Sequence, residues 1–363
     1  MPEPEVFRSQ FPVFERFSYL NAGTEGPLPE RAAAAVRERI ELEVNDGRCG
    51  KPYFEGLMEL ASRLRGSYAQ VLGCGEDEVA LTGSTTDGVN TVLSGLDLRP
   101  GDQIVTSDEE HPGVLAPLGR AQRRSGVEVR VVPFADVAEA ASPTTRLIAC
   151  SHVSWVSGRV ADVAALTATG APVLLDAAQA LGAVPVDVHA LEVDFYAASG
   201  QKWLCGPEGS GCLFVRQDRL DEVFVPWPGY GSVADPQNAL AFELAEGVKR
   251  LDHGFPAGLR SALALASLEV LAEADWDWIH ERATSLAAWL ADRLRELGLE
   301  VAPRGRSTLI SWKVEDPPAE VERLGAQGFI VRSIPGAGLV RASPGAWSSE
   351  QELEGLARLA AGR

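Results

Sequence analysis

Lys202 is the residue whose type and surroundings first suggest chemistry, in the stretch AASGQKWLCGPEGSG (197–211). The chain has only four lysines against twenty-nine arginines, so arginine carries nearly all of its positive charge. Arginine stays protonated in proteins, whereas a lysine removed from water can lose its proton and act as an amine nucleophile. Small residues precede Lys202 and a glycine-rich turn follows it, which is not the setting of a surface lysine. We therefore expect Lys202 to have a chemical role.

Polar residues also follow two apolar segments at points where a strand would end. Asp176 comes directly after an apolar run in PVLLDAA, and TGSTTDG (82–88) follows EVAL and begins a helical pattern. A buried carboxylate is costly without a positive partner, whereas a helix start offers N–H groups and a favourable dipole to a phosphate. Helix capping by Asp176, and by Ser84 or Thr85, is the simpler role for each segment.

His111 follows a further predicted strand, in SDEEHPG (107–113). By itself a loop histidine is more often structural or solvated. Together with Lys202, Asp176 and the hydroxyl-rich helix start, it meets the requirements of pyridoxal 5′-phosphate. That cofactor needs a lysine for a Schiff base, a carboxylate at the ring nitrogen, a phosphate site and an imidazole near the ring. We predict this cofactor and no metal site.

These residues need a scaffold that brings strand ends together. From about residue 55 to 216, apolar strand-like runs alternate with helical segments, which indicates a doubly wound, mostly parallel α/β sheet. The segments predicted as strands are EVALTG, QIVTSD, VEVRVVP, RLIACSHV, PVLLDAA, DFYAAS and GCLFVR. Ligands of such sheets bind outside the carboxyl ends of the strands, where the polar residues above are expected.

The pattern changes after the Pro/Gly-rich passage VPWPGYGSVADPQ. Two long helices are expected at about 257–274 and 276–297, and a closing helix in SSEQELEGLARLAAG. Between them a small sheet is predicted from LEVAP, STLISWKV, FIVRSIP and GLVRASP. We expect a large domain over residues 16–255 and a small C-terminal α/β domain over 256–363, with the segment 1–15 packing on the small domain.

Composition excludes several classes of function. The formal net charge is −18 and no basic cluster occurs, so nucleic acid is not an expected partner. The start MPEPEVFRSQ lacks the basic stretch and apolar run of a signal peptide, and charges interrupt the apolar helices short of a membrane span. The five cysteines form no CxxC pair, which is typical of free thiols in a reducing compartment. We expect a cytoplasmic protein without a membrane segment.

The sequence resembles the class V aminotransferase group of fold type I pyridoxal-phosphate enzymes. This group includes cysteine desulfurases, isopenicillin N epimerase, C–S lyases and several transaminases. The likeness runs from YLNAGTEGPLP (19–29) to VRASPGAW (340–347), and its most specific part is DFYAASGQKWLCGPEGSGCL (194–213). The resemblance implies the fold type I architecture, with a mostly parallel seven-stranded sheet in the large domain, and a homodimer.

The resemblance also implies a role for each matching residue. Lys202 would form the Schiff base and move the Cα proton of the substrate, Asp176 would pair with the pyridine nitrogen, and His111 would stack over the ring. The other implied cofactor contacts are Ser84, Thr85, Thr86, Gln179, Ser199 and Gln201. The implied substrate contacts are Asn21, Ala22, Gly23, Trp155 and Arg341. Of these, Arg341 would grip the α-carboxylate, because its guanidinium fork suits a planar carboxylate.

Departures from the group bear on the function. Cysteine desulfurases carry a nucleophilic cysteine on a loop that is here only IPGAG (334–338), and no cysteine follows Cys212. Trp155 stands where desulfurases commonly have an asparagine, and Gln201 where many relatives have a histidine. Phe255 replaces a Thr or Ser that in relatives reaches the phosphate of the other subunit. Persulfide-forming desulfurase activity is therefore disfavoured at this point.

The resulting hypothesis is an enzyme that removes the Cα proton of an amino acid. Aminotransferase and C–S lyase chemistry both remain open, because they share that first step. Amino-acid epimerisation is an alternative outcome. A protein that binds the cofactor without turnover is a further alternative, from a different functional class.

Overall fold

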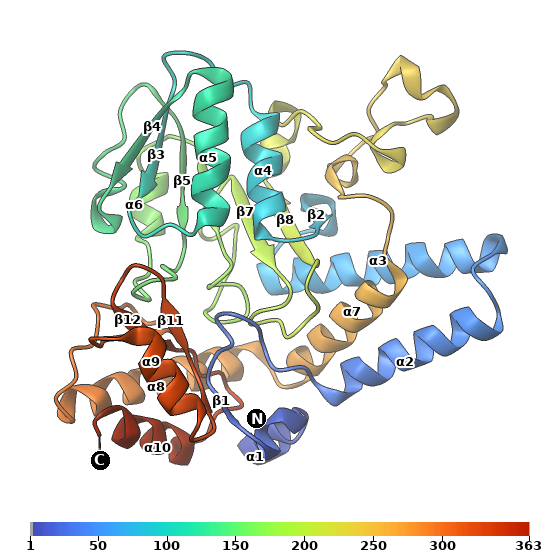
Figure 1. The fold of residues 1–363 in the computed structure, drawn as a ribbon. Helices are drawn as coiled ribbons and strands as arrows, with labels where there is room; N and C mark the ends of the chain where they lie inside the picture. Colours follow the sequence, from blue (N-terminus) through green and yellow to red (C-terminus); the bar gives the residue numbers. More distant parts are fainter. Residues whose placement is uncertain (1–2, 363) are drawn as a thin grey trace.

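A seven-stranded sheet forms the centre of the computed structural model, which describes residues 3–362. Its strand order is β2-β8-β7-β6-β5-β3-β4 (Figure 1). β8 runs antiparallel to both of its neighbours, and the other pairings are parallel. The strands are β2 (Val79–Thr82), β3 (Gln103–Ser107), β4 (Glu128–Val132), β5 (Thr145–Ser151), β6 (Val173–Asp176), β7 (Phe195–Ser199) and β8 (Gly211–Val215). Six of them lie within segments predicted as strands and β5 begins one residue before its segment, so the mostly parallel sheet is confirmed.

Helices cover both faces of the sheet. α4 (Thr85–Gly95) and α5 (Pro112–Ser125) lie on one face, and α3 (Gly50–Leu72) and α7 (Gly258–Glu273) on the other (Figure 1). Successive residues of β6 alternate between these two cores, since Leu174 packs with α4 and α5 whereas Leu175 packs with α3 and α7. Burial on both faces explains why the strands are apolar almost throughout.

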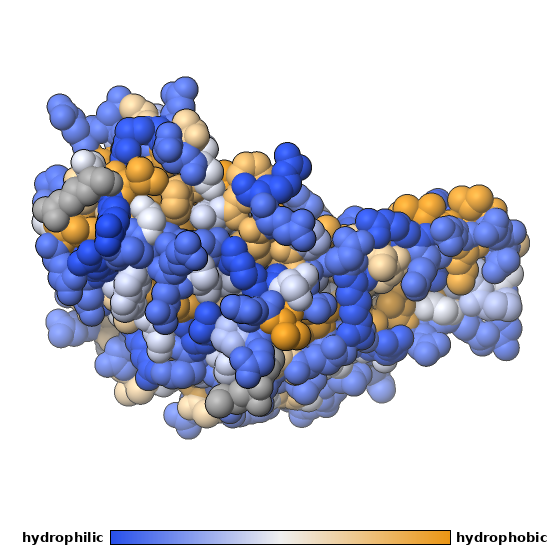
Figure 2. Space-filling view, turned by 90° about the horizontal axis from the view of Figure 1, so that it is seen from below, coloured by the Kyte–Doolittle hydropathy of each residue, from blue (hydrophilic) through white to orange (hydrophobic). Residues whose placement is uncertain are grey.

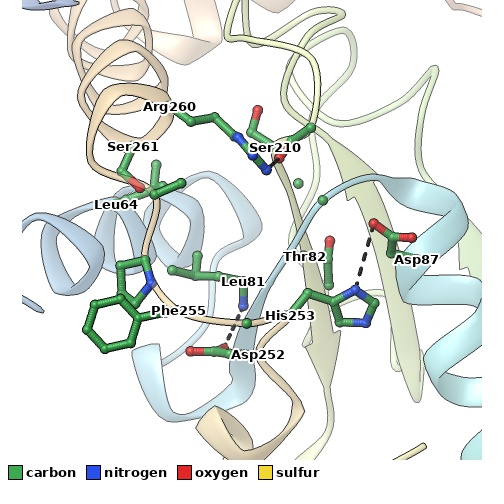
Figure 3. Close-up of a pocket in the computed structure, with 16 residues that line it drawn as sticks. Leu64, Leu81, Thr82, Asp87, Ser210, Asp252, His253, Phe255, Arg260 and Ser261 are labelled. Atoms are coloured by element: carbon green, nitrogen blue, oxygen red, sulfur yellow. Dashed lines mark hydrogen bonds and ion pairs between the residues drawn. The ribbon is translucent and has the colours of Figure 1, made fainter. Parts of the chain in front are cut away.

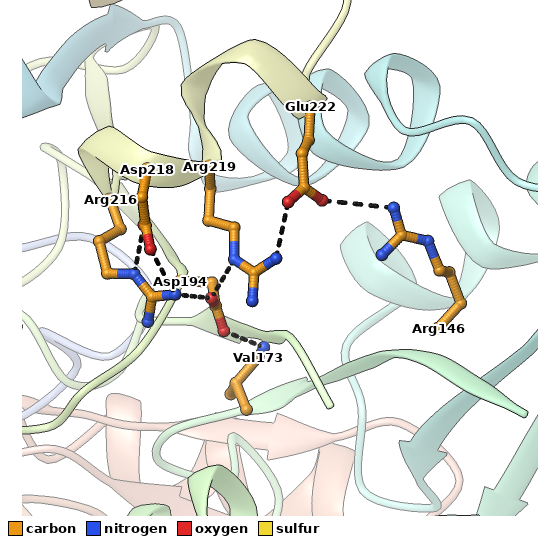
Figure 4. A network of polar contacts seen from close by, with 7 residues as sticks. All are labelled: Arg146, Val173, Asp194, Arg216, Asp218, Arg219 and Glu222. Carbon is orange, nitrogen blue, oxygen red and sulfur yellow. Dashed lines mark hydrogen bonds and ion pairs between the residues drawn. The ribbon is translucent and has the colours of Figure 1, made fainter. Parts of the chain in front are cut away.

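A polar network joins the sheet at the strand ends that lie away from Lys202 (Figure 4). Asp194, directly before β7, accepts hydrogen bonds from the backbone N–H of Val173 at 2.7 Å and from Arg219 at 2.8 Å. Arg216, directly after β8, approaches the same carboxylate at 2.9 Å. Because every lone pair of a buried carboxylate needs a donor, this network fixes the relative positions of β6, β7 and β8.

A second, smaller sheet lies near the C-terminus. It is antiparallel, in the order β11-β12-β9, and α8 (Trp276–Glu296) and α10 (Glu350–Ala360) share its core. Its strands are β9 (Ile310–Lys313), β11 (Arg332–Ile334) and β12 (Leu339–Ala342). Two short helices are α9 (Pro317–Gly325), between β9 and β11 in the chain, and α6 (Val163–Thr167), between β5 and β6. The strand expected in LEVAP is reduced to a single bridge at Val301, since Pro303 has no N–H to continue the ladder.

The N-terminal segment crosses from this smaller sheet towards the large one. β1 (Ser18–Tyr19) pairs in parallel with β10 (Phe329–Ile330), and Asn21 forms a bridge with Ser343. Ahead of it, α1 (Pro4–Arg8) packs Phe7 edge-on against Trp278, with 5.3 Å between ring centroids. Of these contacts only that of Phe7 belongs to the segment 1–15, and the predicted division into domains stays a prediction.

The helices α2 (Glu30–Asn45) and α3 project from the body as a long hairpin (Figure 1). In the view from below, most of this arm is hydrophilic, and apolar residues form patches towards its free end (Figure 2). Val44 is 75% exposed at its end, and Ile40, Leu42, Phe54 and Met58 are also exposed. An exposed apolar surface of this extent is typical of a protein interface.

Candidate active site

One cavity gathers residues from the carboxyl ends of the strands, the N-terminal segment and the smaller sheet. Of the residues predicted for the site, those that line it are Gly23, Ser84, Thr85, Thr86, His111, Trp155, Asp176, Gln179, Ser199, Gln201, Lys202 and Arg341. The cavity wall also contains Thr24, Glu25, Ala178 and Arg332, which the sequence did not single out. Asn21 and Ala22 do not line it. The Ala22 side chain is buried in the core, and the Asn21 amide oxygen accepts a hydrogen bond from the Thr24 hydroxyl at 2.8 Å.

Lys202 lies in the tight turn that follows β7. Gly200 gives the turn room, because a Cβ atom at this position would collide with the hydroxyl of Ser210 and force that side chain to move. The turn is also held from outside, since the N–H of Gly26 donates to the carbonyl of Gln201 at 2.7 Å. Burial lowers the pKa of Lys202 to about 8, although Asp176 opposes this shift. Near neutral pH, more of this lysine is therefore in the neutral, nucleophilic amine form than in an exposed lysine.

Asp176 ends β6 on the floor of the cavity and is almost completely buried. Its Oδ1 accepts a hydrogen bond from the N–H of Ala178 at 2.8 Å. Burial raises its pKa, and the nearby charge of Lys202 works in the opposite direction. A carboxylate in this position gains from a further positive partner, and the protonated ring nitrogen of pyridoxal phosphate is a partner of that kind.

The start of α4 has the properties of a phosphate site. The hydroxyl groups of Thr85 and Ser199 are buried without any hydrogen-bond partner among residues 3–362, and the first-turn N–H groups of a helix have no partner within it. Ser84 differs from the expectation, because its hydroxyl accepts from the N–H of Asp87 at 3.1 Å and so caps the helix. Helix capping therefore accounts for the Ser84 side chain. The unpartnered hydroxyls of Thr85 and Ser199 fit a phosphate group.

His111 and Trp155 form one wall. His111 caps α5, with Nδ1 accepting from the N–H of Gly113 at 3.0 Å, so its other nitrogen carries the proton when the ring is neutral. The pKa of His111 falls to about 4, through burial first and then through the positive charge of Lys202. The two rings meet edge to face at a centroid distance of 5.0 Å. The imidazole therefore faces the cavity as a neutral ring.

Gln179 is fixed at both ends of its amide. Its Nε2 donates to the carbonyl of Gly23 at 2.7 Å, and its Oε1 accepts from the indole of Trp203 at 3.1 Å. The N-terminal segment is thereby tied to the floor of the cavity beside Asp176.

Arg341 and Arg332 face the same cavity from adjacent strands. They stand directly opposite each other in the antiparallel pairing of β11 with β12, an unfavourable arrangement for two like charges. Arg341 is fully buried and donates to the carbonyl of Trp155 at 2.7 Å, while both arginines reach the hydroxyl of Thr24. Burial and the charge of Arg332 lower the pKa of Arg341 to about 9. Neither forms an ion pair within residues 3–362, so an anionic ligand would remove the repulsion.

A second cavity lies behind the start of α4 (Figure 3). His253 contacts the hydroxyl of Thr91 at 3.0 Å, and Asp252 accepts from the N–H of Leu81 at 2.8 Å. Phe255 lines this cavity and is 49% exposed, with its ring edge-on to Phe54 of α3. A phenyl ring offers a phosphate no hydrogen-bond donor.

Comparison with known proteins gives the family. The profile of the aminotransferase class-V family matches residues 19–337. The chain belongs to the class V aminotransferases. It is thus an enzyme of this family, its cofactor is pyridoxal 5′-phosphate, and the predicted fold type I architecture is confirmed.

Relatives within the family are named for sulfur chemistry. Cysteine desulfurase CsdA of Escherichia coli K12 is 31% identical over 80% of this chain and 77% of its own length. A probable cysteine desulfurase of Methanothermobacter thermautotrophicus is 32% identical over 64% of this chain, and the match spans 61% of that relative's length. Solved structures of C-DES are 28% identical. A mutant with glycine covalently linked to the PLP cofactor has a TM-score of 0.92 and covers 99% of both chains.

A second C-DES structure corrects the expectation about persulfides. It is described as a complex of a cystine C–S lyase with its reaction product cysteine persulfide, and it has a TM-score of 0.91 over 97% of this chain and 99% of its own. The hypothesis of an aminotransferase or C–S lyase in which persulfide-forming desulfurase activity is disfavoured was therefore wrong. The missing loop cysteine was taken to disfavour persulfide formation, but a persulfide can also form when a disulfide substrate loses both of its sulfur atoms in one fragment.

Two further observations concern the described residues. Between residues 3 and 362, no helix is both long enough and apolar enough to cross a lipid bilayer. In the same part of the chain, no group of three or more histidine, cysteine, aspartate or glutamate side chains is arranged to hold a metal ion.

Proposed function

We propose that this protein is a persulfide-forming desulfurase that cleaves the Cβ–S bond of cystine. The observation that carries the proposal is a cavity without a cysteine, in a chain whose relatives are named for desulfurase chemistry. Cys150, Cys205 and Cys212 are buried, Cys49 is exposed on the projecting arm and Cys74 is half-buried, and none of the five lines the cavity. The second sulfur of a persulfide must then come from outside the chain, and the disulfide of cystine provides it.

The overall reaction balances with one water molecule. Cystine and water give cysteine persulfide, pyruvate and ammonia. The Cα–H and Cβ–S bonds break, and the electron pair of the Cβ–S bond leaves with the sulfur. When bound, pyridoxal phosphate supplies an electron sink that makes the Cα proton acidic.

We propose the following roles for the residues of the chain. Lys202 accepts the Cα proton at Nζ, and Asp176 keeps a proton on the ring nitrogen. Arg341, with Arg332 opposite it, binds carboxylate, and the neutral ring of His111 bounds the cofactor on one side. The proposed cofactor contacts besides these are the hydroxyls of Thr85, Thr86 and Ser199 and the amides of Gln179 and Gln201.

Product analysis tests the proposed reaction. The cofactor-loaded protein is incubated with cystine, and pyruvate, ammonia and alkylated persulfide are quantified, with cysteine as a parallel substrate. We expect the three products in equal amounts from cystine, and only slow pyruvate formation from cysteine. Amino-group transfer to a keto acid without pyruvate, or cleavage that releases no persulfide, would contradict the proposal. The Lys202→Ala protein measures the background reaction.

Arg341→Lys should weaken substrate binding more than it slows the chemistry. Lysine keeps the positive charge but cannot make the two parallel hydrogen bonds of a guanidinium to a carboxylate. We expect KM for cystine to rise roughly tenfold, with kcat changed much less. Steady-state kinetics measure both constants, and the exposed Arg323→Lys is the matched control. An unchanged KM would mean that another residue holds the carboxylate.

We further propose that the active form is a homodimer. Exposed apolar side chains on the arm, among them Val44, Phe54 and Met58, and Trp227 and Tyr230 on the neighbouring loop, support an interface between copies. Analytical ultracentrifugation should give twice the chain mass of 38.7 kDa. A double change of Val44 and Met58 to Glu should shift this mass towards the monomer. A wild-type protein that sediments as a monomer at all concentrations would refute the dimer.

A further inference from the structure

Glu25 contributes a carboxylate to the cavity wall that the roles above leave unused. Its main chain is firmly held. The N–H of Glu25 donates to the carbonyl of Asn21 at 3.2 Å, and the Tyr19 hydroxyl donates to the carbonyl of Glu25 at 3.0 Å. The next residue, Gly26, touches the lysine turn so closely that a Cβ atom there would collide with the carbonyl oxygen of Lys202. The backbone at Glu25 is therefore fixed beside the lysine turn, and its side chain forms part of the cavity wall.

The Glu25 carboxylate forms no hydrogen bond within residues 3–362. The titratable groups that face it are Lys202, Glu208 and Tyr19, and Arg332 and Arg341 line the same cavity. Burial, and then the like charge of Glu208, raise the pKa of Glu25 to about 7, and only Lys202 opposes this. A half-buried carboxylate beside another carboxylate is unfavourable unless a positive group approaches it.

Lys202 is the only cation that offsets the charge of Glu25, and the same lysine would hold the cofactor. Within residues 3–362 the cavity wall therefore presents two arginines without ion-pair partners and one carboxylate that has no cation reserved for it. A substrate with two carboxylates and two ammonium groups supplies both kinds of missing charge, and cystine has this composition.

We propose that Glu25 binds the ammonium group at the distal end of the substrate, the end that does not react. Glu25 is then a specificity-determining residue, which selects amino acids that carry a second amino group. This inference rests on the proposed function only for the identity of the natural substrate. The charge preference itself concerns binding.

Two unreactive analogues test this preference. In 2,7-diaminosuberate two methylene groups replace the sulfur atoms of cystine, and 2-aminosuberate differs from it only by lacking the distal amino group. Calorimetry on the cofactor-loaded protein gives the affinity for each analogue. We expect the wild type to bind the diamino analogue about tenfold more tightly, and Glu25→Gln to reduce this ratio to about one. Binding of 2-aminosuberate should stay within about twofold of the wild type in this variant, because its contacts are unchanged.

Glu208→Gln is the matched control, since this neighbouring side chain is exposed and does not line the cavity. It should keep a preference of at least about tenfold, because removal of this like charge leaves Glu25 more fully ionised. A Glu25→Gln protein that retains the preference, or a wild type that has none, would overturn the role of Glu25. Neither analogue contains a C–S bond, so the result does not depend on persulfide chemistry. A wild type that fails to release persulfide but prefers the diamino analogue would refute the proposed function and leave the role of Glu25 standing.

Discussion

Lys202→Ala should abolish turnover and covalent attachment of the cofactor while leaving the protein folded. An amine at this position is the proposed acceptor of the Cα proton, and loss of a positioned acid–base group typically costs about 10²–10⁴-fold in rate. The fold should tolerate the change, because the burial of Lys202 disfavours its charge and, among residues 3–362, its ammonium group has no hydrogen-bond partner. Pyruvate formation measures turnover, and borohydride reduction with peptide mapping locates the attachment.

The matched control for this variant is Lys313→Ala, because Lys313 is an exposed lysine at the end of β9. It should retain wild-type activity and cofactor. If Lys202→Ala turned over at a rate within tenfold of the control, Lys202 could not be the proton acceptor. If the pyridoxyl group mapped to another lysine, the assignment of the cofactor site would be wrong.

The Asp176→Ala protein should lose most of its activity and keep its fold, because the carboxylate acts mainly on the cofactor ring. Without the carboxylate, the ring nitrogen no longer holds its proton, and removing such electrostatic stabilisation costs about 10²–10³-fold in kcat. The lost hydrogen bond to the N–H of Ala178 costs about 1 kcal/mol, which is partly offset because a buried carboxylate is also removed. Activity and thermal unfolding are measured together.

Asp176→Asn separates the two effects. An asparagine keeps the size of the side chain and an oxygen that accepts from Ala178, but it carries no negative charge for the ring nitrogen. We expect it to unfold like the wild type and to be nearly as inactive as the alanine variant. Near-normal turnover of Asp176→Asn would remove the role proposed for the charge of Asp176.

Features set by local sequence could be predicted. The apolar strands, the turn after β7 and the helix start at Ser84 each follow from short patterns, because strand burial, glycine turns and capping depend on neighbouring residues. The position of Asp176 at a strand end also followed, since parallel strands bring their carboxyl ends to one edge. Ser84 shows the limit of this approach, because the same pattern suits a phosphate ligand and a helix cap.

The side of the cavity that is built from distant segments could not be predicted. Thr24 and Glu25 reach the site only because their segment is hydrogen-bonded to the lysine turn and pairs with the smaller sheet. Arg332 faces the cavity because of the register that places it opposite Arg341. No short pattern specifies such pairings, since they depend on how elements far apart in the chain pack.

The missing loop cysteine was a misleading signal. The absence of this cysteine argues against persulfide formation only if the enzyme itself has to supply one of the two sulfur atoms of the persulfide. A disulfide substrate brings its own sulfur acceptor, so a cavity without a cysteine is compatible with persulfide formation. The charged groups of the cavity, rather than its thiols, are the features that bear on the substrate.

The pairing of β1 with β10 has a consequence for how the protein is made. Ser18 is synthesised early, but its partner Phe329 is added after nine-tenths of the chain, and Asn21 waits still longer for Ser343. Until β10 and Ser343 have been made, the N-terminal segment therefore lacks its docking partners, and Glu25 cannot take its place beside Lys202. The growing chain can assemble the central sheet before then, but this wall of the cavity forms only after the smaller sheet has been synthesised.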